Sequence, residues 1–421
     1  MKHRKLFMTI LTLVGGMALI VAGCSNSQQN AVPKIQTNIP DAEPDSKVWG
    51  KVFPLQYESY LKNNEATTET RYGGSKPVSK YLTQPLLPEL FKGYGFALEY
   101  NEDRGHTYSV EDVTHIKRIN DKSPSSCWNC KSSDNVKLWA AEGKDYFKVP
   151  FKQRLDQIKH PIGCANCHDA KTMDLKVTNP NFIDSAKRLN IDLSKATKQE
   201  MRTYVCAQCH NEYYFKPGTM EVTNPWDKGF NPDEMVTYYN EIQFSDWQHP
   251  DSKTKMIKAQ HPEFEMFKSG THGANGVSCA DCHMPYERDK DKKKYSSHHW
   301  TSPLKNIEQS CRTCHRDKTA DELKTRVEYT QVKVYETMIK AQEASNAAHK
   351  AVKAALEVPE ADQNAIKQAQ DLIRKAQFEW DFVAAENSMG FHNPSLALET
   401  LAKSIDNSRQ AQLIAEKITK K

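Results

Sequence analysis

The chain has 421 residues, of which only 38% are apolar, a formal net charge of +5 and a mean hydropathy of −0.74. So few apolar residues cannot fill a large core by themselves. The modest positive charge argues against a nucleic-acid-binding protein, which would be strongly basic, and mildly favours an anionic substrate.

Residues 1–23 have the pattern of an export signal. Three basic residues near the start are followed by an apolar stretch from Leu6 to Val21 and by small residues before Cys24. A cysteine at this point is typical of bacterial lipoproteins, in which Cys24 becomes the lipidated N-terminus. The alternatives are a secreted protein with an incidental free cysteine and an uncleaved membrane anchor. We predict an exported protein, anchored by lipid at the outer face of the cytoplasmic membrane or free in the periplasm.

The mature chain divides by composition into three parts. Residues 24–45 are polar with several prolines, which predicts a flexible tether. Residues 46–318 are rich in Pro, Gly, aromatic residues and His, and lack the long alternation expected of a sheet. Residues 319–421 are rich in Ala, Lys, Glu and Gln. No stretch after the signal approaches the roughly eighteen apolar residues needed to cross a bilayer.

The last part predicts long helices, because its apolar residues recur at helical spacing. The first stripe comprises Val334, Met338, Ala341, Ala348, Val352 and Ala355. After Pro359 a second stripe comprises Ile366, Ala369, Ile373 and Ala376. Asn393 and Pro394 predict the cap and first turn of a third helix that reaches about Ile418. Such polar helices need a partner surface, either the preceding region or a second copy of the chain.

Five C-x-x-C pairs dominate the middle part. About 0.3 such pairs would be expected by chance from eleven cysteines in a chain of this length. The pairs are Cys127 and Cys130, Cys164 and Cys167, Cys206 and Cys209, Cys279 and Cys282, and Cys311 and Cys314. The last four are followed directly by His168, His210, His283 and His315. C-x-x-C-H is the attachment signature of c-type haem, in which the histidine ligates the iron.

Two other chemistries explain the pairs less well. Zinc would require pairs converging in fours and leaves the regular histidine unexplained. A thiol–disulfide exchange motif would occur once, next to a βαβ pattern. We therefore predict a mainly α fold with little β structure: an irregular multihaem c-type cytochrome core over residues 46–318, with long C-terminal helices. Five haems would supply the apolar bulk that the side chains lack.

The first pair differs from the others because Lys131 stands where histidine is expected. Axial ligand identity decides what a haem iron does. A lysine ligand must be deprotonated, which requires a lowered pKa, and the opposite face of this haem could stay open for substrate. The other four haems each need a second histidine for electron transfer. Spacing alone leaves ten candidates: His106, His115, His160, His249, His261, His272, His298, His299, His349 and His392.

Cys-Trp-x-Cys-Lys followed by four C-x-x-C-H motifs resembles ammonia-forming cytochrome c nitrite reductase, the pentahaem family. The resemblance covers nearly the whole mature chain. It extends to Arg104-Gly105-His106, Cys206 to Tyr213, Lys258-Ala259-Gln260-His261, Thr271-His272-Gly273 and Gly390-Phe391-His392. It implies four distal ligands: His298 for the second haem, with His299 as a neighbouring alternative, His106 for the third, His392 for the fourth and His272 for the fifth.

The resemblance also implies the residues of the open haem. Arg118, Tyr213 and His261 match the family's active-site arginine, tyrosine and histidine, with Arg104 as a competitor for the first. A calcium ion next to the site would be held by the Glu212 carboxylate, the Gln260 side-chain oxygen and the backbone carbonyls of Tyr213 and Lys258. All four offer oxygen, which a hard cation prefers.

The implied activity is the six-electron reduction of nitrite to ammonium at the Lys131 haem. The expected partners are a membrane quinol-oxidising electron donor and a second copy of the chain in a homodimer. No nucleic-acid partner is expected. Two alternatives stay open: an electron-carrier cytochrome without catalysis, and a related reductase acting mainly on sulfite or hydroxylamine.

Overall fold

The computed structural model describes residues 35–67 and 69–420, so the predicted signal peptide and Cys24 lie outside the described residues. A single compact unit begins at Thr37. Its first residues lie against the second cysteine motif: the amide of Thr37 donates to the Lys171 carbonyl (2.9 Å), and Ile39 and Trp49 are buried with Ala165 and Ala170. Residues 37–45 are therefore part of the folded unit, and here the structure differs from the flexible tether predicted for residues 24–45.

Residues 46–318 form short elements. The α-helices are α2 (Ser46–Gly50), α3 (Pro54–Leu61), α4 (Leu87–Leu90), α5 (Ser109–His115), α6 (Asn135–Glu142), α7 (Pro180–Arg188), α8 (Lys198–Ala207), α9 (Pro232–Glu241), α10 (Glu263–Ser269), α11 (Thr271–Ala274), α12 (Cys279–His283) and α13 (Ile307–Ser310). The 3-10 helices are η1 (Lys62–Glu65), η2 (Lys80–Leu82), η3 (Gly95–Ala97), η4 (His106–Tyr108), η5 (Ser125–Trp128), η6 (Gly143–Lys148), η7 (Phe151–Arg154), η8 (Cys164–Asn166), η9 (Leu193–Lys195) and η10 (Pro303–Lys305).

The strands form only two-stranded antiparallel hairpins in the described residues. β1 (Glu69–Thr70) pairs with β2 (Gly73–Gly74), β3 (Tyr214–Phe215) with β4 (Val222–Thr223), β5 (Trp247–Gln248) with β6 (Lys255–Met256), and β7 (Tyr286–Arg288) with β8 (Lys294–Ser296). The prediction of a mainly α fold with little β structure is confirmed.

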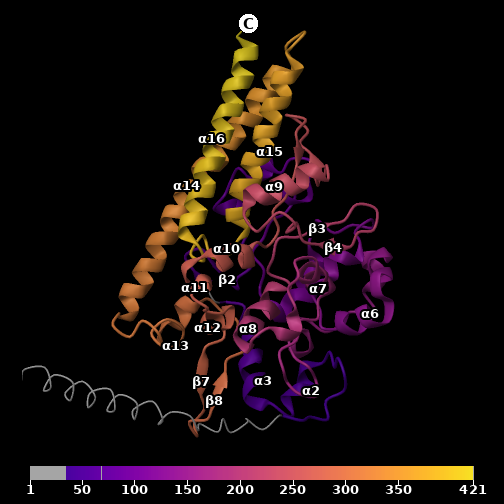
Figure 1. Cartoon of the computed structure of the whole chain (residues 1–421), viewed down its shortest axis with the longest axis vertical. Coiled ribbons are helices and arrows are strands. Elements are labelled where there is room, and N and C mark those ends of the chain that lie inside the picture. Colours follow the sequence, from indigo (N-terminus) through magenta and orange to yellow (C-terminus); the bar gives the residue numbers. More distant parts are fainter. Residues whose placement is uncertain (1–34, 68, 421) are drawn as a thin grey trace, which may run out of the picture. The chain divides into compact units, whose positions relative to one another are not determined.

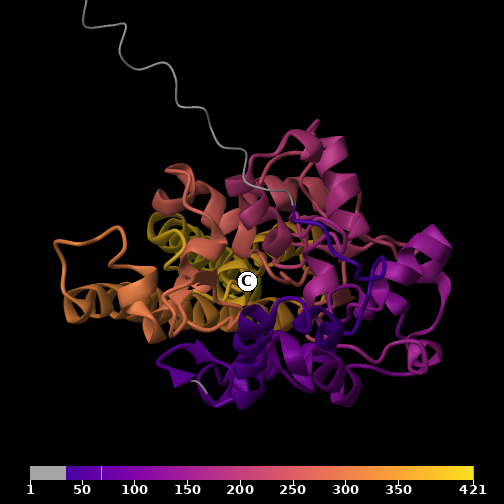
Figure 2. The same cartoon turned by 90° about the horizontal axis from the view of Figure 1, so that it is seen from below.

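Three long helices follow: α14 (Ala320–Leu356), α15 (Gln363–Ala385) and α16 (Pro394–Thr419). Each begins at a side-chain cap, from Thr319, Asp362 and Asn393 respectively, which satisfies amides that the first turn leaves free. All ten residues of the two predicted stripes are buried. Many residues along the seam are Ala or Ser, which lets the helices approach closely (Figure 1). Figure 2 shows the three helices from below, with the earlier segments beside them.

Two buried histidines join α14 to the segment before β6. The rings of His249 and His349 lie 4.1 Å apart. His349 is held by the Ser252 hydroxyl (2.8 Å) and the Gln377 side chain (2.9 Å), and His249 contacts the Glu89 carbonyl (3.0 Å). Burial, reinforced by His249, lowers the pKa of His349 to about 3. Burial also lowers the pKa of His249.

This pair predicts a loss of stability in mild acid. An unfolded histidine titrates near pH 6.5, and folding favours the neutral form here, so stability falls as the pH drops below about 6.5, by up to about 1.4 kcal/mol per pH unit for each such group. We expect His349→Asn to have a shallower dependence of unfolding free energy on pH than the parent protein, measured by denaturant unfolding between about pH 7 and pH 5. Equal slopes would contradict this assignment.

Candidate haem-binding and catalytic site

Each cysteine motif occupies about one helical turn, which brings its cysteines and the following residue together. The amides of His168, His210 and His315 each donate to the carbonyl of the first cysteine of their motif at 3.0 Å. The fourth motif is α12 itself. The first motif differs, because the Lys131 amide donates to the Trp128 carbonyl (2.9 Å). None of the ten motif cysteines forms a disulfide with another cysteine of the described residues.

Four pairs of histidines face each other across the cysteine motifs. The ring centroids are 6.2 Å apart for His168 and His298, 6.0 Å for His210 and His106, 6.3 Å for His283 and His392, and 6.2 Å for His315 and His272. Two imidazoles on opposite sides of one metal ion, each bonded at about 2 Å, have centroids about 6 Å apart. The residues present therefore fit bis-histidine haem sites, and His298 rather than His299 faces His168.

The third motif lies next to three others. Its Cys209 lies against Cys130 of the first motif, and the Asn179 amide donates to both sulfur atoms (3.7 and 3.5 Å). Its Cys206 lies against Cys279 of the fourth motif, and Cys167 of the second motif contacts the Val205 carbonyl (3.9 Å). The third motif thus lies next to the first, second and fourth motifs.

Trp128 anchors the first motif. Its side chain is fully buried, stacks on Phe151 with centroids 4.1 Å apart, and donates through Nε1 to the Phe151 carbonyl (3.1 Å). The neighbouring Lys131 side chain lies with Nζ 3.5 Å from Oδ2 of Asp103. Asp103 outweighs the effect of desolvation and raises the pKa of Lys131. The lowered pKa that iron ligation requires stays a prediction, because the charge of the iron itself contributes to it.

Arg118, Tyr213 and His261 gather near Lys131. Desolvation acts to raise the pKa of Asp103, but the charges of Lys131, His261 and Arg118 outweigh it and the pKa is lowered. Burial raises the pKa of Tyr213 well above its usual value, and Arg118 opposes this. The structure therefore brings together the four residues predicted to act at the open haem, and adds Asp103, which the sequence analysis missed.

The two candidate arginines differ in their partners. Arg104 donates to Asp112 (2.7 Å) and pairs with Glu111 (3.1 Å), so its charge is already neutralised. The Arg118 guanidinium lies over the Phe96 ring (4.0 Å) and donates to the Glu99 carbonyl (2.8 Å). In residues 35–67 and 69–420 it pairs with no carboxylate. Arg118 is the arginine whose charge stays available for an anion.

Three of the four predicted calcium ligands contact one another. The fully buried Glu212 carboxylate accepts from the backbone amide of Gln260 (2.6 Å) and from the Tyr239 hydroxyl (3.1 Å). The Gln260 side chain contacts the Lys258 carbonyl (3.3 Å). Burial raises the pKa of Glu212 well above its usual value, and nearby Glu265 acts in the same direction. A buried carboxylate without an ion-pair partner in the described chain fits a hard cation bound nearby.

A buried ion pair fixes the segment that carries Gln260 and His261. Lys258 Nζ lies 2.9 Å from Asp381 of α15, and both side chains are almost fully buried. The other Asp381 oxygen accepts from the Ala259 amide (2.9 Å). Burial would lower the pKa of Lys258, but Asp381 raises it. Asp381 thereby connects the long-helix region to the site.

We expect Asp381→Ala to destabilise the protein by about 3–5 kcal/mol, because it leaves a buried lysine without its counter-charge. Asp371→Ala on the same helix removes an exposed partner of Lys367 and should change the unfolding free energy by less than about 0.5 kcal/mol. Denaturant unfolding of both variants measures the difference. Similar losses of unfolding free energy in Asp381→Ala and Asp371→Ala would contradict the role given to Asp381.

The C-x-x-C turns and facing histidines define the chain as a multihaem c-type cytochrome. A family model described as cytochrome c552 matches residues 45–421. The chain belongs to this cytochrome c552 family.

Relatives extend over nearly the whole chain. It is 43% identical to cytochrome c nitrite reductase subunit NrfA of Nitratidesulfovibrio vulgaris, over 96% of this chain and 84% of that protein. It is 37% identical to cytochrome c-552 of Bacteroides thetaiotaomicron, over 92% and 79%. A solved structure of the cytochrome c nitrite reductase of Desulfovibrio desulfuricans, described with two calcium sites, matches with a TM-score of 0.87 and 42% identity, over 90% and 88%. The predicted resemblance to cytochrome c nitrite reductases, and with it an oxidoreductase enzyme, is confirmed.

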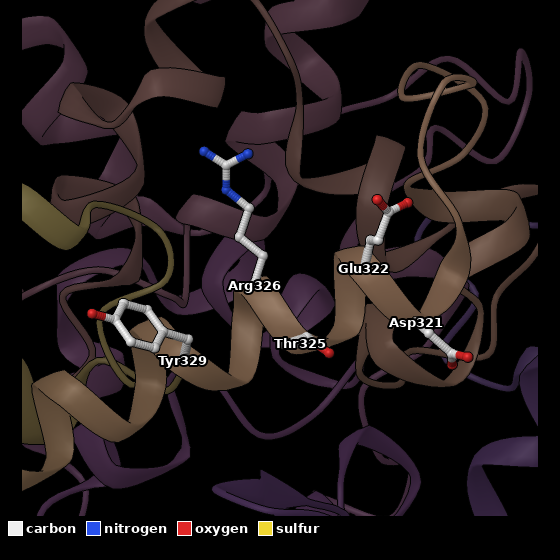
Figure 3. A pocket seen from close by; sticks show the side chains of 5 residues that line it. All are labelled: Asp321, Glu322, Thr325, Arg326 and Tyr329. Carbon is white, nitrogen blue, oxygen red and sulfur yellow. The ribbon is translucent and has the colours of Figure 1, made fainter.

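Two further features lie outside this site. A shallow hollow on the outer face of α14 is lined by Asp321, Glu322, Thr325, Arg326 and Tyr329 (Figure 3). None of these is a predicted site residue. None of the helices in the described residues is long and apolar enough to cross a membrane.

Proposed function

We propose that this protein reduces nitrite to ammonium at a haem held by Cys127, Cys130 and Lys131, with four bis-histidine haems supplying electrons. The reaction takes up six electrons and eight protons per nitrite and releases ammonium and two waters. The observation that carries the proposal is the convergence of Arg118, Tyr213 and His261 on the one motif that lacks histidine. Membership of the cytochrome c552 family supports it.

The haem at the first motif, when bound, supplies the iron that binds and reduces the substrate. Arg118 attracts the nitrite anion and donates hydrogen bonds to its oxygens, since no carboxylate of the described chain competes for it. His261 and Tyr213 supply hydrogen bonds and protons to the same oxygens. The raised pKa of Tyr213 keeps its hydroxyl protonated and able to donate.

The proposed axial pairs are His168 with His298, His210 with His106, His283 with His392, and His315 with His272. The second and fourth motifs both adjoin the third, and the fifth adjoins the fourth through Cys311 and Cys282. The proposed electron route therefore runs through the third motif to the first. A membrane quinol-oxidising donor, lipidation of Cys24 at the outer face of the cytoplasmic membrane, and a homodimer that uses the long helices complete the proposal.

Calcium is proposed beside the site, held by the Glu212 carboxylate, the Gln260 side-chain oxygen and the carbonyls of Tyr213 and Lys258. It would link the two segments that carry Tyr213 and His261 and raise the local positive potential. We expect calcium at about 100 times its dissociation constant to stabilise the protein by about 2.7 kcal/mol. Glu212→Gln should abolish this shift in melting temperature, while Glu241→Gln, at an exposed position, should preserve it. A response that survives in Glu212→Gln would contradict the site.

The function is tested on the purified holoprotein with reduced viologen and nitrite, with ammonium as the measured product. Ammonium in a ratio of one to each nitrite consumed supports the proposal. Haem-loaded protein that forms no ammonium would overturn it. In that case, turnover of sulfite or hydroxylamine would identify a related reductase, and an entirely low-spin spectrum would identify an electron carrier.

A further inference from the structure

The proposed axial histidines differ in what their outer ring nitrogen contacts. Nδ1 of His168, His298 and His283 faces the backbone carbonyls of Met173 (3.0 Å), Ser296 (2.9 Å) and Thr301 (3.3 Å). Nδ1 of His210 and His392 instead faces carboxylates, those of Glu263 (3.4 Å) and the fully buried Glu386. Among these five histidines, only His210 of the third motif and His392, the proposed partner of the fourth, face a carboxylate.

Glu263 is the more informative of the two carboxylates, because one of its oxygens contacts His210 and also lies near His261. Its Oε1 lies 3.4 Å from Nδ1 of His210 and 3.8 Å from Nδ1 of His261. Those rings are 6.3 Å apart. The Asn387 amide donates to the same oxygen (2.6 Å) and holds it in place. The side chain is only 10% exposed, so water screens these contacts weakly.

The backbone around Glu263 reinforces the arrangement. The Glu263 amide donates to the His261 carbonyl (2.8 Å), and the Phe264 amide donates to the His210 carbonyl (3.1 Å). The start of α10 is thus bound to both the third motif and the segment that carries His261. Asn387 and Glu386 are adjacent in the turn after α15, so one turn supports both carboxylate contacts.

A carboxylate changes a ligating imidazole more than a carbonyl does. It accepts a stronger, charge-assisted hydrogen bond from Nδ1–H, fixes the tautomer with Nε2 toward the metal, and makes the ligand more basic. A more basic axial ligand stabilises the oxidised iron and so lowers the reduction potential. On the His261 side, Nδ1 lies 3.8 Å from the same oxygen and makes no hydrogen bond in the described residues. The carboxylate there acts by electrostatic attraction, which favours the ring orientation with Nδ1 toward Glu263 and leaves Nε2 for the substrate.

We infer that Glu263 is a positioning residue that lowers the reduction potential of the third-motif haem and, through the same oxygen, orients His261 at the neighbouring catalytic haem. The inference rests on the proposed function for its ligand assignments. A lower potential makes the third-motif haem, the last before the catalytic haem, a stronger reductant. The same carboxylate links this electron donor to His261, the histidine that must deliver protons.

The test compares three variants of the holoprotein: Glu263→Gln, Glu386→Gln and Glu308→Gln. Glu308 lies beside the fifth motif but pairs with Arg312 and touches no axial histidine. Spectroelectrochemical titration should show one bis-histidine haem shifted to more positive potential in Glu263→Gln, a different one in Glu386→Gln, and none in Glu308→Gln. With nitrite, Glu263→Gln should lower kcat by about 10- to 100-fold, and Glu386→Gln, which does not contact His261, by less.

Unchanged potentials in Glu263→Gln, or an equal loss of kcat in Glu263→Gln and Glu386→Gln, would overturn the inference. These outcomes are separable from failure of the proposed function. If the parent protein forms ammonium while the potentials stay unchanged, the function stands and the role of Glu263 falls. If the parent protein forms no ammonium, the potentials of the variants still test the carboxylate contacts.

Discussion

Replacing Lys131 by histidine should leave a protein that binds its full complement of haem but reduces nitrite at least about 100-fold more slowly. The change converts the first motif into a fifth C-x-x-C-H sequence, so covalent attachment is preserved. The axial ligand, which sets the reactivity of the iron, changes from an amine to an imidazole. The exchange also removes the amine that lies 3.5 Å from Asp103.

The measurements are haem content per chain, the fraction of high-spin haem, and ammonium formation. Lys137→His provides the matched control, because Lys137 is exposed on α6 only six residues further along the chain. It should match the parent protein in all three measurements. Nitrite turnover at the parental rate in a fully haem-loaded Lys131→His variant would refute the special role of the lysine.

The local features of this protein were readable from its sequence. The C-x-x-C-H motifs and the heptad-like stripes of α14 and α15 depend on residues within one or two helical turns, and spacing reports such contacts directly. The helix beginning at Pro394 was predicted for the same reason, since its cap lies one residue before it. The boundary of the tether was predicted less well, because Thr37 is held by Lys171, far along the chain.

Contacts between distant segments could not be predicted from spacing. Ten histidines were candidates for four distal positions, and only the folded chain brings His392 to face His283. The carboxylates Asp103, Glu263 and Asp381 were missed for the same reason. Each is an ordinary acidic residue in the sequence, and its meaning comes from the cation or imidazole that the fold places beside it. The nearest available signal was position, since Asp103 precedes Arg104-Gly105-His106 and Glu263 follows His261 by two residues.

Removing the charge of Arg118 should have the second large effect on activity. We expect Arg118→Ala to lower kcat/KM for nitrite by about 10²- to 10³-fold, the cost of losing one positioned donor to developing negative charge. The kcat/KM of Arg118→Lys should fall between those of the parent protein and Arg118→Ala, because an ammonium keeps the charge but lacks the planar guanidinium that donates two parallel hydrogen bonds. The fold should tolerate both changes, since the half-buried Arg118 side chain contacts the Glu99 carbonyl and the Phe96 ring but no carboxylate of the described chain.

The charge of the substrate separates anion binding from general damage to the site. Nitrite is an anion and hydroxylamine is uncharged, so Arg118→Ala should raise KM for nitrite more than KM for hydroxylamine. Arg104→Lys is the control, because Arg104 is already paired with Asp112 and Glu111 and the new lysine keeps that charge. Arg104→Lys should keep the KM values for nitrite and for hydroxylamine within about twofold of those of the parent protein. An equal loss for both substrates in Arg118→Ala would mean that Arg118 supports the structure of the site rather than the binding of the anion.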